Sequence, residues 1–267
     1  METAPSTEDL ERVGTGYQAD VFAWGPGRVL RLAHRPDQRQ DVANETAALT
    51  AAGRAGAPVP TAFERVEVDG RPGVVMQRVE GEDLLFLLGR KPWLLPDIAG
   101  ALGRLHARLH EVEAPPELPA LNTLVAPRLS SPVVPDDVRA QALARLEELP
   151  AGTRLGHFDF HPANVLGARG DYKVIDWSNA ARSDPEADVA RTSLILLAAT
   201  APPHTPFVVR RLDPLGRRLL HRLYLRTYRR ERPLDLELMR RWRRVLAAAR
   251  LAEERPGERS WLLAEAR

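Results

Sequence analysis

The first eighty residues carry short runs in which apolar and polar positions alternate, the pattern of half-buried β-strands. Two turns separate these runs: a segment with Gly14 and Gly16, and the Asp69-Gly70 pair, which favours a hairpin. The predicted strands cover a hairpin over residues 13–22 and single strands over residues 28–32, 63–68 and 73–77. One helix is predicted among them, over residues 40–52. The pattern therefore indicates an antiparallel sheet with one helix.

Beyond residue 81 the apolar residues follow the spacing of amphipathic helices. The predicted helices cover residues 96–111, residues 136–149, a segment opened by Asp184 and Pro185, and most of the chain after residue 203. Residues 114–135 contain six prolines and are predicted to be an irregular surface loop, which could also border a substrate site. The second part of the chain is thus expected to be mainly helical, which makes the whole an α+β protein.

Composition narrows the class of protein. The 267 residues are 44% hydrophobic and 28% charged, ordinary values for a globular protein of one large domain or two small ones. The absence of cysteine excludes disulfide scaffolds, cysteine zinc sites and thiol nucleophiles. The N-terminus lacks the apolar core of a signal peptide, and no run approaches the ~20 apolar residues of a membrane span. We therefore expect a soluble cytoplasmic protein without a membrane partner.

Charge is distributed unevenly, although the net charge is only +2. Residues 203–267 contain 17 arginines and 8 acidic residues, a local net charge of +9, whereas residues 1–202 carry −7. A solvated basic helix face is the usual meaning of such a run. No nucleic-acid motif accompanies the arginines, so no nucleic-acid partner is expected.

The stretch from His157 to Trp177 contains the candidate chemistry. Asp159 and Asn164 stand five residues apart, the interval between the base and the metal-binding Asn of a protein-kinase catalytic loop. Asp176 ends the second strand of a predicted hairpin that begins after Asn164. Phosphoryl transfer from ATP to a hydroxyl needs one carboxylate to accept the proton and oxygen ligands for Mg²⁺. Asp159 suits the first role, and Asn164 together with Asp176 suits the second.

Histidines offer a different interpretation, the zinc site of a metal-dependent hydrolase. His157, Asp159 and His161 alternate and would share one face of a strand. Such a site needs more ligands, and the remaining histidines form no second cluster at ligand spacing. His106 and His110 are four residues apart but lack the Glu of the zinc-protease motif, so we expect them to be structural.

The pattern His157-x-Asp159-x-His161-Pro162-x-Asn164, followed by Ile175-Asp176-Trp177, resembles the signature of the aminoglycoside phosphotransferase and choline kinase family. The resemblance covers nearly the whole chain through Asp188. It implies a protein-kinase-like fold of two lobes with ATP between them. Residues 1–80 would form a small antiparallel-sheet N-terminal lobe that binds the nucleotide, and residues 81–267 a larger, mainly helical C-terminal lobe with the catalytic and substrate-binding residues.

The same resemblance implies roles for residues of the first lobe. Gly14 and Gly16 would let a hairpin turn approach the phosphates, although Ala19 replaces the third glycine of the kinase loop and the pair could be only a turn. Arg31 occupies the strand position of the phosphate-binding lysine, since no lysine precedes Lys91. Glu45 would be its helix partner. The alternatives are a solvated strand arginine and an exposed helix glutamate.

Two further assignments follow from the order of elements in the family. Gln77 and Val79 lie where the hinge between the lobes would bind the adenine edge, and Gly81 suits the linker. Asp188 would brace the catalytic loop, with simple complementarity to a helix dipole as the alternative.

The resulting hypothesis is an ATP- and Mg²⁺-dependent kinase that phosphorylates a hydroxyl of a small molecule. A non-catalytic pseudokinase, suggested by Ala19 and Arg31, is the alternative, and a metal-dependent hydrolase is a third. The basic C-terminal part predicts poor activity on polycations such as kanamycin and better activity on neutral or other small hydroxyl compounds, unless local acids reverse the sign of the pocket. Those acids are Glu253, Glu254 and Glu258.

Overall fold

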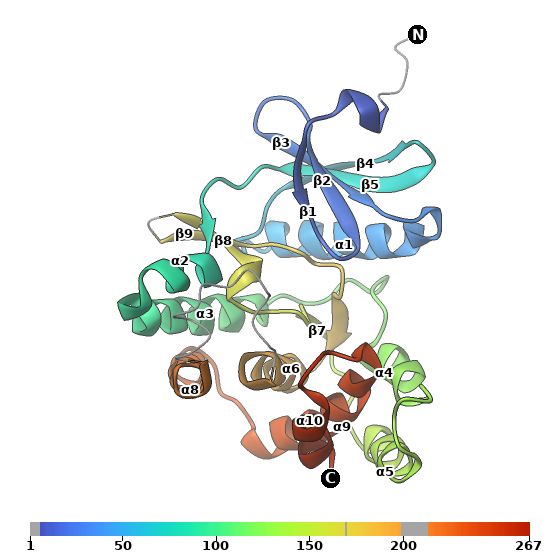
Figure 1. Ribbon diagram of the computed structural model, residues 1–267, viewed down its shortest axis with the longest axis vertical. Helices are drawn as coiled ribbons and strands as arrows, with labels where there is room; N and C mark the ends of the chain where they lie inside the picture. Colours follow the sequence, from blue (N-terminus) through green and yellow to red (C-terminus); the bar gives the residue numbers. More distant parts are fainter. Residues whose placement is uncertain (1–5, 169, 199–212) are drawn as a thin grey trace.

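The computed structural model describes residues 6–168, 170–198 and 213–267. A smaller sheet-rich part lies above a larger helical part (Figure 1). The first part is a five-stranded antiparallel sheet in the order β1-β2-β3-β5-β4, with helix α1 (Arg39–Arg54) against one face. Its strands are β1 (Arg12–Thr15), β2 (Ala19–Ala23), β3 (Arg28–Ala33), β4 (Ala62–Val68) and β5 (Arg71–Gln77). This sheet with its helix confirms the pattern expected from the sequence.

Alternation along β3 decides which face of the sheet each side chain occupies. Leu30 and Leu32 are fully buried in a cluster that also contains Phe22 and Val75. Arg31 lies between the two leucines and therefore points to the opposite face, where it meets α1. A slip of one residue in register would place the Arg31 charge in this apolar cluster and remove both leucines from it, and each leucine contributes roughly 1.5–3 kcal/mol when buried. The apolar positions thus fix the direction of Arg31.

The second part contains two small sheets and most of the helices. Strands β6 (Glu82–Asp83), β8 (Val165–Ala168) and β9 (Asp171–Val174) form one sheet, and β7 (Arg154–Gly156) pairs with β10 (Ala181–Ser183). The helices are α2 (Leu84–Arg90), α3 (Leu95–Leu109), α4 (Leu121–Leu129), α5 (Asp136–Glu147), α6 (Pro185–Ala198), α8 (Asp213–Glu231), α9 (Leu236–Arg250) and α10 (Arg259–Ala266). The fold is α+β, as the sequence predicts.

Four large aromatic side chains are fully buried in the helical core: Trp177, Tyr224, Tyr228 and Trp242. They come from the chain after β9, from α8 and from α9, which pack against α3 and α6. Large aromatic residues contribute much of the buried apolar area of a core. The buried aromatic side chains of α8 and α9, together with Trp177 at the end of the His157–Trp177 stretch, therefore pack the core beneath that stretch.

The prediction of an irregular loop over residues 114–135 is wrong for the centre of this segment, where helix α4 forms. Leu121, Val125 and Leu129 are spaced four residues apart and are all buried. This face packs against α5 and α9, so tertiary burial offsets the backbone hydrogen bond that Pro127 cannot donate inside the helix. Proline content alone misled the prediction because it ignores the apolar period.

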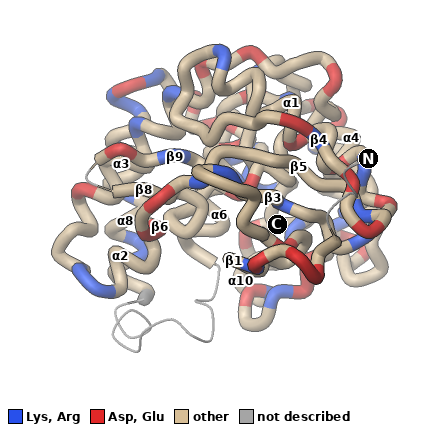
Figure 2. The backbone as a smooth tube through the Cα atoms, turned by 90° about the horizontal axis from the view of Figure 1, so that it is seen from above, with Lys and Arg blue, Asp and Glu red and all other residues tan. Residues whose placement is uncertain are grey.

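Basic and acidic positions are interspersed over both parts of the molecule (Figure 2). Among the described residues, no helix is both long and apolar enough to cross a membrane. The +9 charge of residues 203–267 falls partly on residues outside the described ranges.

Gly81 links β5 to β6 in a conformation that other residues avoid, with φ of +122°. A Cβ atom there would lie 2.5 Å from the backbone of Gly167 in β8. We expect Gly81→Ala to lower the free energy of unfolding by about 2 kcal/mol or more, because strain and overlap add. Gly70→Ala is the matched control, since Gly70 also has positive φ but has open space around it. Urea denaturation of both variants tests this; equal losses would show that the close approach to β8 contributes nothing.

Candidate active site

The loop after β7 has an unusual backbone conformation at the centre of the candidate site. Phe158 has φ of +58°, in the left-handed region that a bulky residue rarely adopts. Its amide donates to Oδ1 of Asp188 at 2.9 Å, and the amide of His157 donates to Oδ2 of the same carboxylate. Asp188, in the first turn of α6, therefore holds two consecutive amides of the loop. This confirms that Asp188 contacts the catalytic stretch, and it places Asp159 directly after the strained residue.

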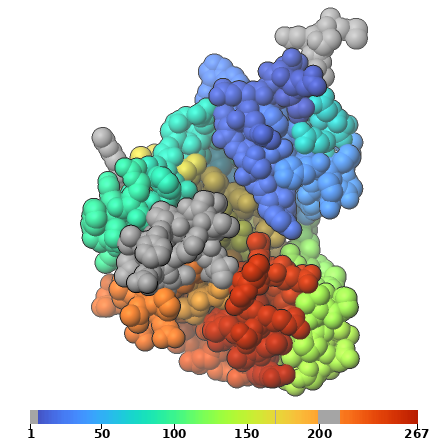
Figure 3. Space-filling view, in the orientation of Figure 1, coloured from blue at the N-terminus to red at the C-terminus, as the bar shows by residue number. Residues whose placement is uncertain are grey.

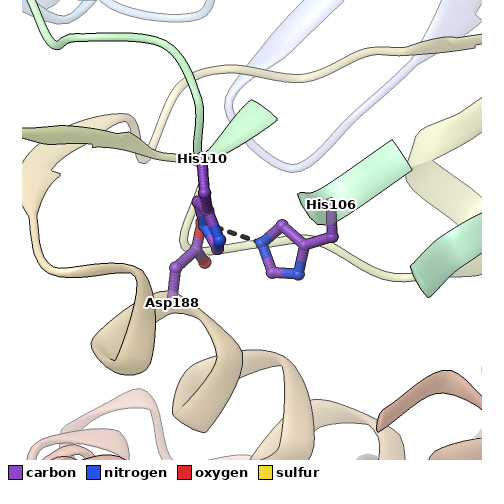
Figure 4. Close-up of side chains that lie close together, drawn as sticks. All are labelled: His106, His110 and Asp188. Atoms are coloured by element: carbon purple, nitrogen blue, oxygen red, sulfur yellow. Dashed lines mark hydrogen bonds and ion pairs between the residues drawn. The ribbon is translucent and has the colours of Figure 1, made fainter. Parts of the chain in front are cut away.

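Asp188 is in turn held by two histidines, His106 of α3 and His110, which directly follows this helix (Figure 4). The Nε2 atoms of His106 and His110 lie 3.1 and 3.3 Å from Oδ2 of Asp188, although the His106 contact lacks hydrogen-bond alignment. The Nδ1 atom of each ring lies 2.7 Å from a tyrosine hydroxyl, Tyr224 for His106 and Tyr228 for His110. Burial acts to raise the pKa of Asp188, but the two histidines lower it well below its usual range. The histidine pair is structural, as expected, and supports the brace.

Asp159 and Asn164 are in direct contact. The Nδ2 atom of Asn164 donates to the backbone oxygen of Asp159 at 2.8 Å and to its Oδ2 at 3.2 Å. Because the amide nitrogen is used in these bonds, the carbonyl oxygen of Asn164 is the atom that remains for a metal ion. Burial acts to raise the pKa of Asp159, but His161, Arg191 and His157 together lower it well below its usual range. Asp159 is therefore a carboxylate throughout the physiological pH range, and 30% of its side chain is exposed.

Arg31 joins Glu45 to Asp176. Its Nη1 lies 2.7 Å from Oε2 of Glu45 on α1, and its Nη2 lies 3.2 Å from Oδ1 of Asp176. Glu45 also accepts the backbone amide of Trp177, and Ser178 Oγ donates to Asp176 at 2.8 Å. Burial raises the pKa of Glu45 to about 7, while the Arg31 guanidinium opposes this shift. The expected contact between Arg31 and Glu45 is present, so neither is a solvated surface residue.

Of the two glycines of the first hairpin, Gly14 lies in β1 and Gly16 in the turn between β1 and β2. The Gly16 amide donates to the Ala19 carbonyl at 2.8 Å, and a Cβ at Gly16 would lie 3.3 Å from that oxygen. Gly14 pairs with Val21 in the β1–β2 ladder. The tip residue, Tyr17, is 89% exposed. Gly16 therefore lies in a tight turn, where a side chain would be crowded.

The two predicted hinge residues, Gln77 and Val79, differ in the hydrogen bonding of their backbone groups. The amide of Gln77 donates to the Thr61 carbonyl at 2.8 Å, so it is not available to an adenine edge. Within the described residues, the backbone groups of half-buried Val79 make no hydrogen bond. Of the two, Val79 has the backbone groups that remain open to a nucleotide base.

The sequence analysis missed Arg191 and named Glu253 only as an acid of the acceptor pocket, without its partner. Arg191 Nε donates to the Phe158 carbonyl at 3.2 Å, and its Nη2 lies 2.6 Å from Oε1 of Glu253. Arg191 follows Asp188 by one helical turn, which is the signal that could have placed it beside the catalytic loop. Glu253 is 62 residues away and carried no such signal.

The donor atoms of this site suit a hard cation. Asp176 offers a carboxylate whose side chain is 39% exposed, and Asn164 offers a carbonyl oxygen, the ligand types that Mg²⁺ prefers. By contrast, His157 Nε2 is engaged by the Ile175 carbonyl at 3.0 Å. In the described parts of the chain, the only three-residue cluster with metal-ligand spacing is His106, His110 and Asp188, which is fully buried. The alternating His157, Asp159 and His161 thus form no zinc site there.

Comparisons with known proteins agree with this geometry. Residues 9–213 match a family model described as the phosphotransferase enzyme family. A search of curated proteins gave no match. A thermostable mutant of aminoglycoside phosphotransferase APH(4)-Ia is similar with a TM-score of 0.63 and 18% identity, covering 97% of this chain and 92% of that one.

Other solved structures are similar to about the same degree. Aminoglycoside-3'-phosphotransferase of type VIII has a TM-score of 0.63 and 20% identity, covering 93% of this chain and 96% of that one. The GDP and kanamycin complex of APH(2")-IIia has a TM-score of 0.55 and 19% identity, covering 99% of this chain and 92% of that one. At such identities these likenesses show the fold, which is protein-kinase-like. The family match extends over most of the sequence, and the chain belongs to the phosphotransferase enzyme family.

Proposed function

We propose that this phosphotransferase moves the γ-phosphate of ATP to a hydroxyl group of a small molecule, with Mg²⁺ as cofactor. The observation that carries the proposal is the position of Arg31, which contacts both Glu45 and Asp176. A cation held between a helix glutamate and a metal-binding aspartate is the arrangement that protein kinases use to place ATP phosphates, there with lysine. Residues 1–80 would serve as the nucleotide lobe and residues 81–267 as the catalytic lobe.

Each polar residue of the site has one role in the proposed reaction. The acceptor oxygen forms a bond to the γ-phosphorus, the bond between that phosphorus and the β–γ bridging oxygen breaks, and ADP leaves. The hydroxyl proton passes to a carboxylate oxygen of Asp159, which is ionised because neighbouring groups hold its pKa below the usual range. Asn164 and Asp176 would hold Mg²⁺, which neutralises charge on the phosphates. Arg31 would bind a phosphate oxygen, and Gly14 and Gly16 would let the loop approach the phosphates.

Similar proteins support the use of a nucleotide. Solved structures with this fold include a complex of an APH(4)-Ia mutant with ADP and hygromycin B, and a streptomycin-ATP complex of APH(2")-IIa. The first has a TM-score of 0.59 and the second 0.60. A pseudokinase that had lost its chemistry would have no physical need for the bonded pair of Asp159 and Asn164. The expected hinge contact is through the open backbone of Val79, with Gln77 beside it.

Asp159→Asn is predicted to lower turnover by ~10²–10⁴, because the base is lost while the shape of the loop is kept. ATP should still bind, since Asp159 faces the acceptor and not the nucleotide. Asp171→Asn is the matched control, an exposed acid at the start of β9 in the same stretch. Release of labelled product from γ-labelled ATP, together with calorimetric ATP binding, measures both properties. Near-normal turnover of Asp159→Asn would remove the basis for the kinase assignment.

Asp176→Ala is predicted to abolish the dependence of ATP binding on Mg²⁺, because an anionic metal ligand is removed. ATP is titrated into the protein once in the presence of Mg²⁺ and once in the presence of EDTA. The unchanged protein should show two different affinities for ATP, whereas the variant should show the same affinity in both. A variant that still binds ATP more tightly with Mg²⁺ would show that the metal is held elsewhere. Zinc in place of Mg²⁺ should give no comparable gain, and a zinc-specific effect would favour the hydrolase hypothesis.

A further inference from the structure

Four arginines from distant parts of the chain converge on one carboxylate, that of Glu253. Arg191 of α6 and Arg128 of α4 lie 2.6 and 3.7 Å from Oε1. Arg250, at the end of α9, and Arg255 lie 3.1 and 3.8 Å from Oε2. We call these four residues with Glu253 the arginine cluster. Its convergence shows that the charge of the C-terminal part is not only a solvated helix face.

The arginine cluster lies between the catalytic loop and the tip of the first hairpin. Arg191 donates to the carbonyl of Phe158, the residue before Asp159. On the other side, the guanidinium of Arg255 lies 5.7 Å from the ring centroid of Tyr17. Figure 3 shows the blue N-terminal part reaching down to the red C-terminal segment on this face. The cluster therefore connects the loop that carries Asp159 to the tip of the β1–β2 hairpin.

Its acidic residues do not reverse the positive charge. Glu258 is buried and binds Arg250 through both oxygens, at 2.7 and 3.0 Å. Glu253 is shared by all four arginines, so two carboxylates face four guanidinium groups. Glu254 is exposed, and no contact joins it to the cluster within the described residues. The cluster therefore carries more positive than negative charge, and the excess comes from Arg128 and Arg191, because Arg250 and Arg255 are balanced by Glu253 and Glu258.

Two members of the cluster have unused hydrogen-bond donors. The side chains of Arg128 and Arg255 are 45% and 52% exposed. Both lie beyond hydrogen-bond distance of Glu253, and in the described parts of the chain their guanidinium groups donate no hydrogen bond. Arg191 and Arg250, in contrast, are buried and bonded. The exposed pair thus presents planar donor groups to solvent, the arrangement that suits a phosphate, sulfate or carboxylate.

We propose that Arg128 and Arg255 bind an anionic group on the acceptor. The acceptor would then carry, besides the hydroxyl that is phosphorylated, a phosphate, sulfate or carboxylate group. This inference rests on the proposed function and specifies its substrate class. The buried pair, Arg191 and Arg250, fixes Glu253, which in turn holds the exposed pair near Asp159. A polycation would meet the same excess charge and be repelled.

The test is a set of related ring compounds that differ in charge: glucose, glucuronate, glucose 6-phosphate, glucose 6-sulfate, glucosamine and kanamycin. Calorimetry with the full chain saturated with Mg²⁺ and AMP-PNP measures their binding. We expect at least one anionic compound to bind about tenfold or more tighter than glucose, as for hydrogen bonds to charged groups, and kanamycin to bind weakest. The anion that gains most identifies the group recognised. Anionic compounds that bind no tighter than glucose, or not at all, would overturn the inference.

Variants separate the arginines from general electrostatics. The double variant Arg128→Gln with Arg255→Gln should lose the preference for anions, and the corresponding double lysine variant should keep part of it. Arg240→Gln is the control, because Arg240 is an exposed α9 residue paired with Glu237 and outside the cluster. An unchanged preference in the glutamine variant would overturn the inference.

Labelled-product assays on the same compounds keep the two proposals distinct. Anion-selective binding without any phosphate transfer would contradict the proposed function and leave the binding site standing. Transfer to kanamycin, with no preference for anions, would support the proposed function and overturn the anionic acceptor.

Discussion

The contact of Arg31 with Glu45 and Asp176 is the interaction on which the rest of the candidate site depends. It joins the sheet, α1 and the segment after β9, three elements that the chain brings together from 145 residues apart. A buried charge is tolerated only when it is paired, and removing one partner of such a pair typically costs about 3–5 kcal/mol. Leu30 and Leu32 set the direction of Arg31 through the register of β3. Packing thus determines where the charge lies, and the charge determines where Asp176 lies.

The catalytic loop has a separate support on its other side. Asp188 accepts the amides of His157 and Phe158, and His106 and His110 hold Asp188 from the C-terminal end of α3. These contacts sustain the left-handed conformation of Phe158, which would otherwise be costly. Asp176 and the Asp159 loop are therefore held by two different sets of buried polar residues. Under the proposed function, the first set would fix the phosphate end of the site and the second the acceptor end.

The sequence was sufficient for the features that depend on local period or on fixed spacing. The antiparallel sheet, α1 and the closeness of Asp159 to Asn164 follow from such patterns, whereas the contact of Arg31 with Glu45 was expected only from the family resemblance. Helix α4 was missed because proline content outweighed a short apolar period. The arginine cluster could not be foreseen, since α4, α6 and the C-terminal segment meet only through tertiary packing. For the same reason the sequence analysis could name the acids Glu253, Glu254 and Glu258 but not the arginines that pair with Glu253 and Glu258.

The most direct test of the account is a double-mutant cycle between Arg31 and Glu45, read as the dissociation constant of ATP with Mg²⁺. Arg31→Ala and Glu45→Gln should each weaken binding, and the double variant should be little worse than the poorer single one. The predicted coupling is about 1 kcal/mol or more, as expected for residues in one ion-paired network. Arg31→Lys should restore part of the affinity, and Arg35→Ala, which alters an exposed arginine, should not matter. Effects that add to within about 0.5 kcal/mol would contradict the account, because Arg31 would then act on ATP without Glu45.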